Sequence, residues 1–256
     1  MNASILALRD VVARSGKTPS EYQRMVVGRP GLLRLLRHDG IVTLAGPVPG
    51  VLGLSLRRRL YPRLLGRAGR NVVFGTNVVL RHPHKIFIAD GVVIEDNVVL
   101  DAYGDGNSGI FLGRGVRIGR NSVLSCRNGD IRVERGVSVG INCVIDSESS
   151  VYIGEEAQLG PACQLLDGGA GIDVGRHVVL GPSVNVLDGG TIGGGTTVAA
   201  GSVVAGALPA FSEAGGSPAR VRPVRRPLAA RVVRRREPAR PTPIPPSDTI
   251  TPAAGA

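Results

Sequence analysis

The residues that could do chemistry are few in this chain of 256 residues. Histidine is the side chain best suited to general-base catalysis near neutral pH, and the chain has four: His38, His82, His84 and His177. No pair of them has the spacing of zinc ligands. The three cysteines are an odd number, form no CxxC motif and have no histidine at ligand spacing. The sequence therefore indicates neither a disulfide framework nor a metal site.

Two of the cysteines lie within a six-residue repeat that extends from Phe74 to Val203. Blocks such as IEDNVV, LGRGVR and VGRHVV occur fourteen times. Their first position is aliphatic apart from Phe74, and their fourth is glycine or asparagine in ten blocks. Neither a helical period nor simple alternation explains this pattern, which predicts a repeat architecture. Cys143 and Cys163 occupy fifth positions, so we expect small core residues in a reducing compartment.

Three blocks are expected to form one triangular coil with a short parallel strand on each face. The first position points inward, and glycine or asparagine at the fourth suits a corner that requires positive φ. His177, at the fourth position of VGRHVV, is then a corner residue. About seven coils are expected, starting at Phe74, Ile88, Leu112, Val133, Ile153, Val174 and Ile192, with irregular segments at 80–87, 100–111, 124–132, 145–152 and 165–173.

Charge divides the chain into three regions. Residues 1–70 carry a net charge of +10, residues 71–216 carry −6 and residues 217–256 carry +7. We expect a basic, amphipathic helical region at 1–70, with helices over 3–14 and 21–37, the second broken near Arg29-Pro30-Gly31, and with His38 facing solvent. The β-helix is expected at 71–216, and a mostly disordered arginine- and proline-rich tail at 217–256. Basic ends suit an anionic membrane surface better than nucleic acid, because no aromatic platform or nucleic-acid motif accompanies them.

The apolar run from Ile41 to Leu56 allows two interpretations. Pro47 and Pro49 interrupt it, and it is shorter than the roughly 20 residues that span a bilayer. It could lie in the plane of a membrane, with the arginines that follow it reaching toward phosphates, or pack as a cap on the open end of the repeat. The start of the chain lacks the order of a signal peptide. We therefore expect a cytoplasmic protein, peripheral on the inner face of the membrane.

Several segments resemble the hexapeptide-repeat acyltransferases, and among them an acetyltransferase-like branch associated with surface polysaccharide and lipopolysaccharide. They are LGLSLRRRLYPRLL (52–65), LRHPHKI (80–86), NSVLSCRNGDI (121–131), VGINCVI (139–145) and AAGSVVAGALPAFSEAGGSPARV (199–221). The resemblance implies an all-β, left-handed parallel β-helix that assembles as a homotrimer. It also implies transfer of an acyl group from acetyl-CoA or another acyl-CoA, without a metal, to a hydroxyl or amine of a sugar or lipid-linked glycan of the cell envelope.

The resemblance also implies where the thioester would bind. The positions that match the coenzyme A groove are Gly181, Pro182, Ala199, Ala200, Gly201 and Arg220. Pro182 and Val179 depart from the branch, and Pro182 has no N–H to donate. The small residues could equally serve only the stacking of coils. Asp101, Asp105, Asp146 and Asp167, in the irregular segments, could orient an acceptor sugar or simply be solvated loop residues.

The general base of the family lies on an extended loop, and this chain departs from the pattern there. The segment LGPACQLLDGGAGIDVG (159–175) holds no histidine, and Asp167-Gly168-Gly169 is expected to be all that is left of the loop. His82, His84 and His177 are the candidates to replace it, although His177 also suits a corner and the other two a structural irregularity. Two functions follow: an acyltransferase-like protein of doubtful activity, or a non-catalytic β-helical scaffold or partner subunit.

Overall fold

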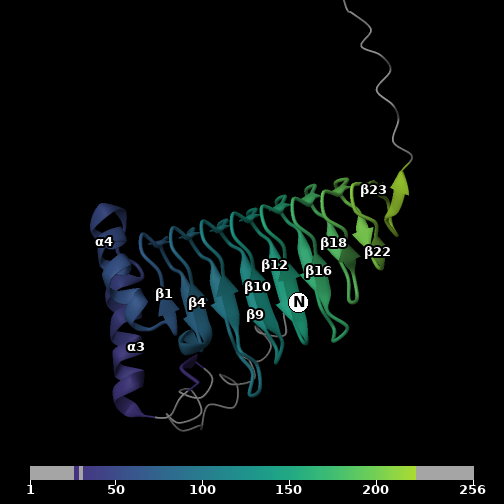
Figure 1. Ribbon diagram of the computed structural model, residues 1–256. Coiled ribbons are helices and arrows are strands. Elements are labelled where there is room, and N and C mark those ends of the chain that lie inside the picture. Colours follow the sequence, from purple (N-terminus) through teal and green to yellow (C-terminus); the bar gives the residue numbers. More distant parts are fainter. Residues whose placement is uncertain (1–25, 29–30, 223–256) are drawn as a thin grey trace, which may run out of the picture. The chain divides into compact units, whose positions relative to one another are not determined.

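The computed structural model describes residues 26–28 and 31–222 (Figure 1). The predicted helix over 3–14 and the tail beyond residue 222 lie outside these residues. The described chain is a left-handed parallel β-helix preceded by two helices, α3 (Leu32–Ala45) and α4 (Gly50–Leu60). Two short 3-10 helices, η1 (Tyr61–Arg63) and η2 (Pro83–Lys85), accompany them. The fold class predicted from the repeat is confirmed.

Three sheets form the faces of the β-helix, and we call them A, B and C. Consecutive strands in each sheet are parallel, apart from the closing pair β23–β24. Sheet A holds β1 (Arg67–Ala68), β4 (Ile86–Ile88), β7 (Ile110–Leu112), β10 (Asp130–Val133), β13 (Ser150–Ile153), β16 (Ile172–Val174), β19 (Thr191–Ile192) and β22 (Ala207–Leu208). Sheet B holds β2 (Val73–Phe74), β5 (Val93–Ile94), β8 (Arg117–Ile118), β11 (Ser138–Val139), β14 (Gln158–Leu159), β17 (Val179–Leu180), β20 (Thr197–Val198), β23 (Glu213–Gly215) and β24 (Arg220–Arg222). Sheet C holds β3 (Val79–Arg81), β6 (Val99–Asp101), β9 (Val123–Cys126), β12 (Val144–Ser147), β15 (Gln164–Leu166), β18 (Asn185–Val186) and β21 (Val203–Val204).

The first positions of the hexads build the core, because they stack in register from coil to coil. Six predicted coil starts, from Ile88 to Ile192, form one buried column of sheet A. Phe74, the seventh, lies instead on sheet B, so the first coil begins at Arg67, earlier than predicted. Each buried aliphatic side chain contributes about 1.5–3 kcal/mol of transfer free energy. The stack therefore needs few aromatic residues.

The fourth positions form the corners, as predicted. Asn77, Asn97, Asn121 and Asn142 all have φ between 55° and 59°, at the corner between sheets B and C. Along this corner the amide of Asn97 donates to Asn121 Oδ1 at 3.1 Å. Asparagine tolerates this left-handed conformation better than most residues. The predicted irregular segments all lie at another corner, between sheets C and A, where loops extend from the lower edge of the stack in Figure 1.

Helices α3 and α4 cover the open end of the first coil. Arg57, only 2% exposed, donates from Nε to Phe74 O at 3.0 Å and from Nη1 to Ala45 O at 3.0 Å and Val48 O at 2.7 Å. One guanidinium thus ties the end of α3, the link to α4 and the first coil together. The cap interpretation of the Ile41–Leu56 run is correct for the inner face of these helices.

The end predicted for the second helix, at residue 37, is wrong, because after the expected break α3 runs from Leu32 to Ala45. The run from Ile41 to Leu56 is divided between α3 and α4. His38 is buried rather than solvent-facing, because it lies with Leu35 and Ala45 on the side of α3 that packs on the first coil, where its Nε2 lies 3.1 Å from Leu80 O. Among the described residues, no helix has both the length and the apolar character needed to cross a membrane.

Candidate functional site

The structure brings five of the six predicted coenzyme A positions together at one corner. Gly181 and Pro182 follow β17, and Ala199, Ala200 and Gly201 follow β20 in the next coil. Gly181 donates its N–H to Val198 O at 2.8 Å, and Gly201 donates to Pro182 O at 2.9 Å. A Cβ on Gly181 would lie 2.7 Å from the nitrogen of Ala200, so the coils approach closely here. We call these five residues the small-residue corner.

The outer side of the small-residue corner is open. A Cβ added to Gly201 would meet no atom within 4 Å. Ala200 is exposed, and its N–H donates to no acceptor among residues 26–28 and 31–222. Two equivalent amides in earlier coils are occupied, because Thr76 donates to Asp96 Oδ1 and Arg120 to Glu95 Oε2, whereas those of Asp96 and Ile141, like that of Ala200, donate to no acceptor among the described residues. The corner thus offers a backbone donor to a polar ligand without a nearby side chain in the way.

Arg220, the sixth position, lies apart from the corner. It belongs to β24, which pairs with β23 at the edge of sheet B, and β23 pairs with β20. Two strand spacings, about 10 Å, separate it from the strand that leads into Ala199. Its side chain is exposed, so it is a peripheral cation rather than part of the corner.

His177 occupies the corner position that its block predicted, with φ 55°. It lies between β16 and β17, in the same coil as Gly181. Its side chain is 58% exposed, and Nδ1 lies 3.4 Å from Glu156 Oε2. A carboxylate partner at Nδ1 leaves Nε2 for proton transfer, which is the arrangement of an oriented general base. Four extended residues, about 13 Å, separate it from Gly181.

His82 and His84 lie at the other end of the stack. They flank Pro83, His82 before η2 and His84 within it, between the first and second coils, whereas Gly181 lies in the sixth. Four to five coil spacings, about 20 Å, therefore separate them from the small-residue corner. His82 is 5% exposed, has φ 50°, and its Nδ1 lies 3.6 Å from Asp101 Oδ1. Its burial and left-handed backbone agree with the structural interpretation of this motif.

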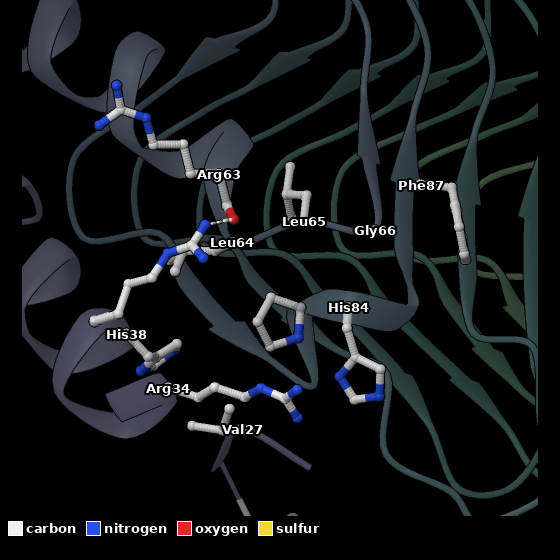
Figure 2. Close-up of a pocket in the computed structure, with 11 residues that line it drawn as sticks. Val27, Arg34, His38, Arg63, Leu64, Leu65, Gly66, His84 and Phe87 are labelled. Atoms are coloured by element: carbon white, nitrogen blue, oxygen red, sulfur yellow. Dashed lines mark hydrogen bonds between the residues drawn. The ribbon is translucent and has the colours of Figure 1, made fainter. Parts of the chain in front are cut away.

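His84 lines a pocket of about 480 Å³ between the cap and the first coils (Figure 2). Arg34 and His84 lie on its lower side, with their polar ends turned toward one another, while the guanidinium of Arg63 points away. The guanidinium of Arg37 donates to Arg63 O. Sequence reasoning missed this pocket, because Arg34 and Arg37 are distant in sequence from His84 and resemble ordinary charges on a helix.

The four aspartates divide into different roles. Asp167 is neither a ligand group nor a solvated loop residue: Oδ2 accepts from Ser149 N at 2.7 Å and Ser150 N at 2.9 Å, and Oδ1 accepts from Gly169 N and Gly171 N, both at 2.9 Å. Burial acts to raise its pKa, but these N–H groups outweigh burial and the pKa is lowered. The turn at 167–171 is therefore closed by its own carboxylate, with help from Asp188, which accepts from Gly168 and Ala170.

Asp101 and Asp146 lie on sheet C, and Asp105 in the longest irregular loop. Asp101 is buried and accepts from Tyr103 N at 3.2 Å, so the solvated interpretation is wrong for it as well. Asp146 forms an ion pair with Arg127 at 2.8 Å, yet its buried Oδ1 has no hydrogen-bond partner among the described residues. Burial raises the pKa of Asp146, against the effect of Arg127. Asp105 is exposed.

The cysteines are buried thiols, as expected for the core. Cys143 and Cys163 are fully buried, and their Sγ atoms donate to Gly160 O at 3.3 Å and Gly181 O at 3.2 Å. Burial raises the pKa of Cys126 to about 12, which leaves it a protonated, unreactive thiol. Across residues 26–28 and 31–222, no group of three or more His, Cys, Asp or Glu side chains is arranged to hold a metal ion.

Comparison with known proteins yields solved structures alone, since no family model and no curated protein matches the chain. The polySia specific acetyltransferase NeuO is 18% identical, with a TM-score of 0.40, over 60% of this chain and 79% of that one. AntD, an N-acyltransferase from Bacillus cereus solved with dTDP and coenzyme A, is 18% identical, with a TM-score of 0.44, over 60% and 82%. A hexapeptide-repeat acetyltransferase from Vibrio cholerae O1 biovar eltor, solved with acetyl coenzyme A, is 18% identical, with a TM-score of 0.37, over 79% and 96%. At these values the likeness concerns the coiled fold and not what this chain acts on.

Proposed function

We propose that this chain is an acyltransferase of the hexapeptide-repeat type, which transfers an acyl group, in the simplest case acetyl, from coenzyme A to a hydroxyl or amine of a cell-envelope sugar. The observation that carries the proposal is the small-residue corner, which has an open outer side and the available N–H of Ala200. These are the positions at which the sequence resemblance places the thioester. Arg220 and Arg222 are the nearby cations for its phosphates. A homotrimer and a location at the inner face of the membrane belong to the same proposal.

His177 is the histidine best placed to serve as the base. It is exposed, it has a carboxylate partner in Glu156, and it shares a coil with Gly181, whereas His82 and His84 are about 20 Å away. Its Nε2 would accept the proton of the acceptor hydroxyl or amine as that group attacks the thioester carbonyl. The thioester supplies an activated acyl group and a thiolate leaving group. The imidazolium would then return the proton to the departing sulfur.

A non-catalytic scaffold is the second candidate, and one observation favours it. The turn at 167–171 follows the repeat closely, and its amides are bonded to Asp167 and Asp188. In the family that the chain resembles, a protruding loop with the histidine would stand here. A chain that keeps the coils but has a short, hydrogen-bonded turn in place of this loop would suit a non-catalytic scaffold or partner subunit.

Coenzyme A binding by calorimetry tests the cofactor side of the proposal. Ala200→Glu places a negative charge at the small-residue corner and should weaken binding at least about tenfold, by repulsion of the phosphates. Ile141→Glu is the matched control, because Ile141 is the exposed residue that follows Gly140 at the same corner three coils earlier. Equal binding by both variants would place the cofactor elsewhere. No binding by the wild-type chain would contradict the enzyme proposal and favour the scaffold.

Thiol release from acetyl-CoA in the presence of sugar acceptors tests the reaction. His177→Ala should lower acceptor-dependent release by about 10²–10⁴-fold, the usual contribution of a general base. His84→Ala should leave it unchanged. Loss of release in His84→Ala but not in His177→Ala would move the base to the other end of the stack. Release that is absent from the wild-type chain with every acceptor, despite coenzyme A binding, would favour the scaffold.

A further inference from the structure

The two capping helices have an apolar face on their outer side as well as on their inner side. The inner side packs on the first coil through Leu35, Ala45 and Arg57. The residues opposite are large apolar side chains, and six of them are between 60% and 80% exposed: Leu32, Leu33, Leu36, Leu44, Val51 and Leu52. We call these six residues the cap surface. An ordinary capping helix exposes polar side chains on its outer side, so the cap surface needs an explanation that capping does not give.

Cations surround the cap surface. Residues 31–70 contain eight arginines and a single acid, Asp39, whose carboxylate lies 3.0 Å from His38 Nδ1. Arg34 and Arg37 flank the leucines of α3, and Arg58 and Arg59 are exposed at the end of α4. Arg57 is the buried exception. A partner that covers the cap surface must therefore be apolar where it meets the leucines and anionic around them.

The pocket beside α3 extends this chemistry. Arg34 and Arg37, from the same helix as the leucines, line it together with His84. Figure 2 shows Arg34 turned toward His84, with the apolar Val27 beside them. A pocket of about 480 Å³ in which the Arg34 guanidinium lies beside the His84 ring (Figure 2) suits a phosphate-sized anion with its substituents, and Arg37, whose guanidinium donates to Arg63 O, adds positive charge to the lining.

We propose that the cap surface docks on an anionic lipid bilayer, with α3 and α4 in the plane of the membrane and a lipid phosphate at the Arg34–Arg37–His84 pocket. Helices of 14 and 11 residues are about 21 and 16 Å long, well short of the roughly 30 Å of the hydrocarbon core, so they lie in the interface. The inner face of these helices is then the cap on the first coil and the outer face is the in-plane membrane segment, so both interpretations of the run from Ile41 to Leu56 hold. The proposal is independent of acyl transfer, because it depends on the opposite end of the stack from the small-residue corner.

Charge argues against the other possible occupants. A second copy of the cap surface would bring two sets of arginines together, which is unfavourable. Residues 1–25 also carry an excess of basic residues, four against two acids, so they do not complement the arginines either. An anionic bilayer offers phosphates to the arginines and acyl chains to the leucines.

Flotation of the full-length chain with vesicles tests the proposal. Vesicles that contain anionic lipid should bind the chain at least about tenfold more strongly than neutral phosphatidylcholine vesicles. Leu33→Ser together with Leu36→Ser should weaken binding at least about tenfold, because both side chains would leave the acyl region. The matched control is Leu166→Ser with Leu187→Ser, two exposed leucines on the β-helix. Arg34→Gln should weaken binding several-fold, and Arg117→Gln, an exposed arginine of sheet B, should not.

Flotation at high salt distinguishes vesicle binding through the cap surface from binding through the basic tail. At about 1 M salt the Debye length falls to about 3 Å, so purely electrostatic attachment is lost while the dependence on Leu33 and Leu36 should remain. Equal binding by the leucine variant and its control would overturn the proposal. If sedimentation shows that the main effect of the leucine variant is loss of self-association, the proposal is also overturned, because a second copy of the chain would then be the occupant. Failure of coenzyme A binding would leave this result unaffected.

Discussion

At the scale of single residues, two carboxylates show how the irregular corner distinguishes structure from chemistry. Asp167 accepts five N–H groups and has no capacity left for a ligand. Asp146 has a buried oxygen without a hydrogen-bond partner among the described residues, and its pKa is raised by burial. The sequence presents both as aspartates in loops of similar composition. What separates them is the direction of the backbone amides around them, which no pattern of residue types encodes.

Asp167→Asn should destabilise the chain by about 2–3 kcal/mol at neutral pH, because an amide accepts these N–H groups less well than a carboxylate. The lowered pKa of Asp167 means that its contribution is complete above the unfolded value of about 3.9 and disappears as the pH falls through the folded value. The gap in unfolding free energy between wild type and variant, measured in urea, should therefore narrow below about pH 4. Asp105→Asn, at an exposed position, is the control and should change little. A difference in unfolding free energy between wild type and variant that stays constant with pH would contradict the role of Asp167 in closing the turn at 167–171.

The histidines show what residue-scale reasoning could and could not predict. The corner position of His177 followed from its place in VGRHVV, and the structure confirms it. Its pairing with Glu156 could not be predicted. Only the register between the coils shows that Glu156 occupies the same corner position one coil earlier, beside His177. The solvent-facing position predicted for His38 is wrong, because its burial depends on which side of α3 packs on the first coil, and α3 has apolar residues on both sides.

At the scale of elements, the β-helix was predictable, whereas the cap could be predicted only as one of two interpretations. A hexad fixes the strand, the inward residue and the corner together, so an error in one block is corrected by its neighbours. The cap has no such repetition. An apolar run with two prolines fits an in-plane membrane segment or a cap equally well, and the two apolar faces of α3 obscure which side is inward. The small-residue corner lies between these cases: its assembly followed from the hexads, and its use as a binding site remains a prediction.

Arg57 should be the residue on which the docking of the cap depends. Arg57→Met keeps the length of the side chain but leaves the carbonyls of Ala45, Val48 and Phe74 without their donor. The expected loss is about 3 kcal/mol in the free energy of unfolding. Arg58→Met removes an exposed bond to Asn71 Oδ1 and should cost less than about 1 kcal/mol. Hydrogen exchange should show faster exchange of α3 and α4 in the first variant, while equal stability of both variants would contradict this role of Arg57.

At the scale of the whole molecule, the outer faces of the three sheets differ in a way that bears on assembly. On sheet C, Val79, Val99, Val123 and Val144 face outward in direct register over four successive coils. On sheet B the corresponding column changes from Val93 to Arg117 and Ser138. On sheet A the column contains Phe87, Phe111 and Arg132, with the two rings stacked at 4.9 Å and the guanidinium 5.2 Å from the Phe111 ring.

The valine column of sheet C is the face best suited to join copies of the chain, because an apolar, flat column of β-branched residues packs well against another surface of the same kind. If the predicted homotrimer forms, sedimentation should give about three times the chain mass of 26.6 kDa. Val99→Asp together with Val123→Asp should shift it to the monomer, since two carboxylates would be buried at each interface. Val93→Asp is the matched control, as Val93 is equally half-buried and outward-facing but on sheet B. A wild-type monomer would contradict the trimer, and dissociation by the control as well would show that sheet C is not the face on which assembly depends.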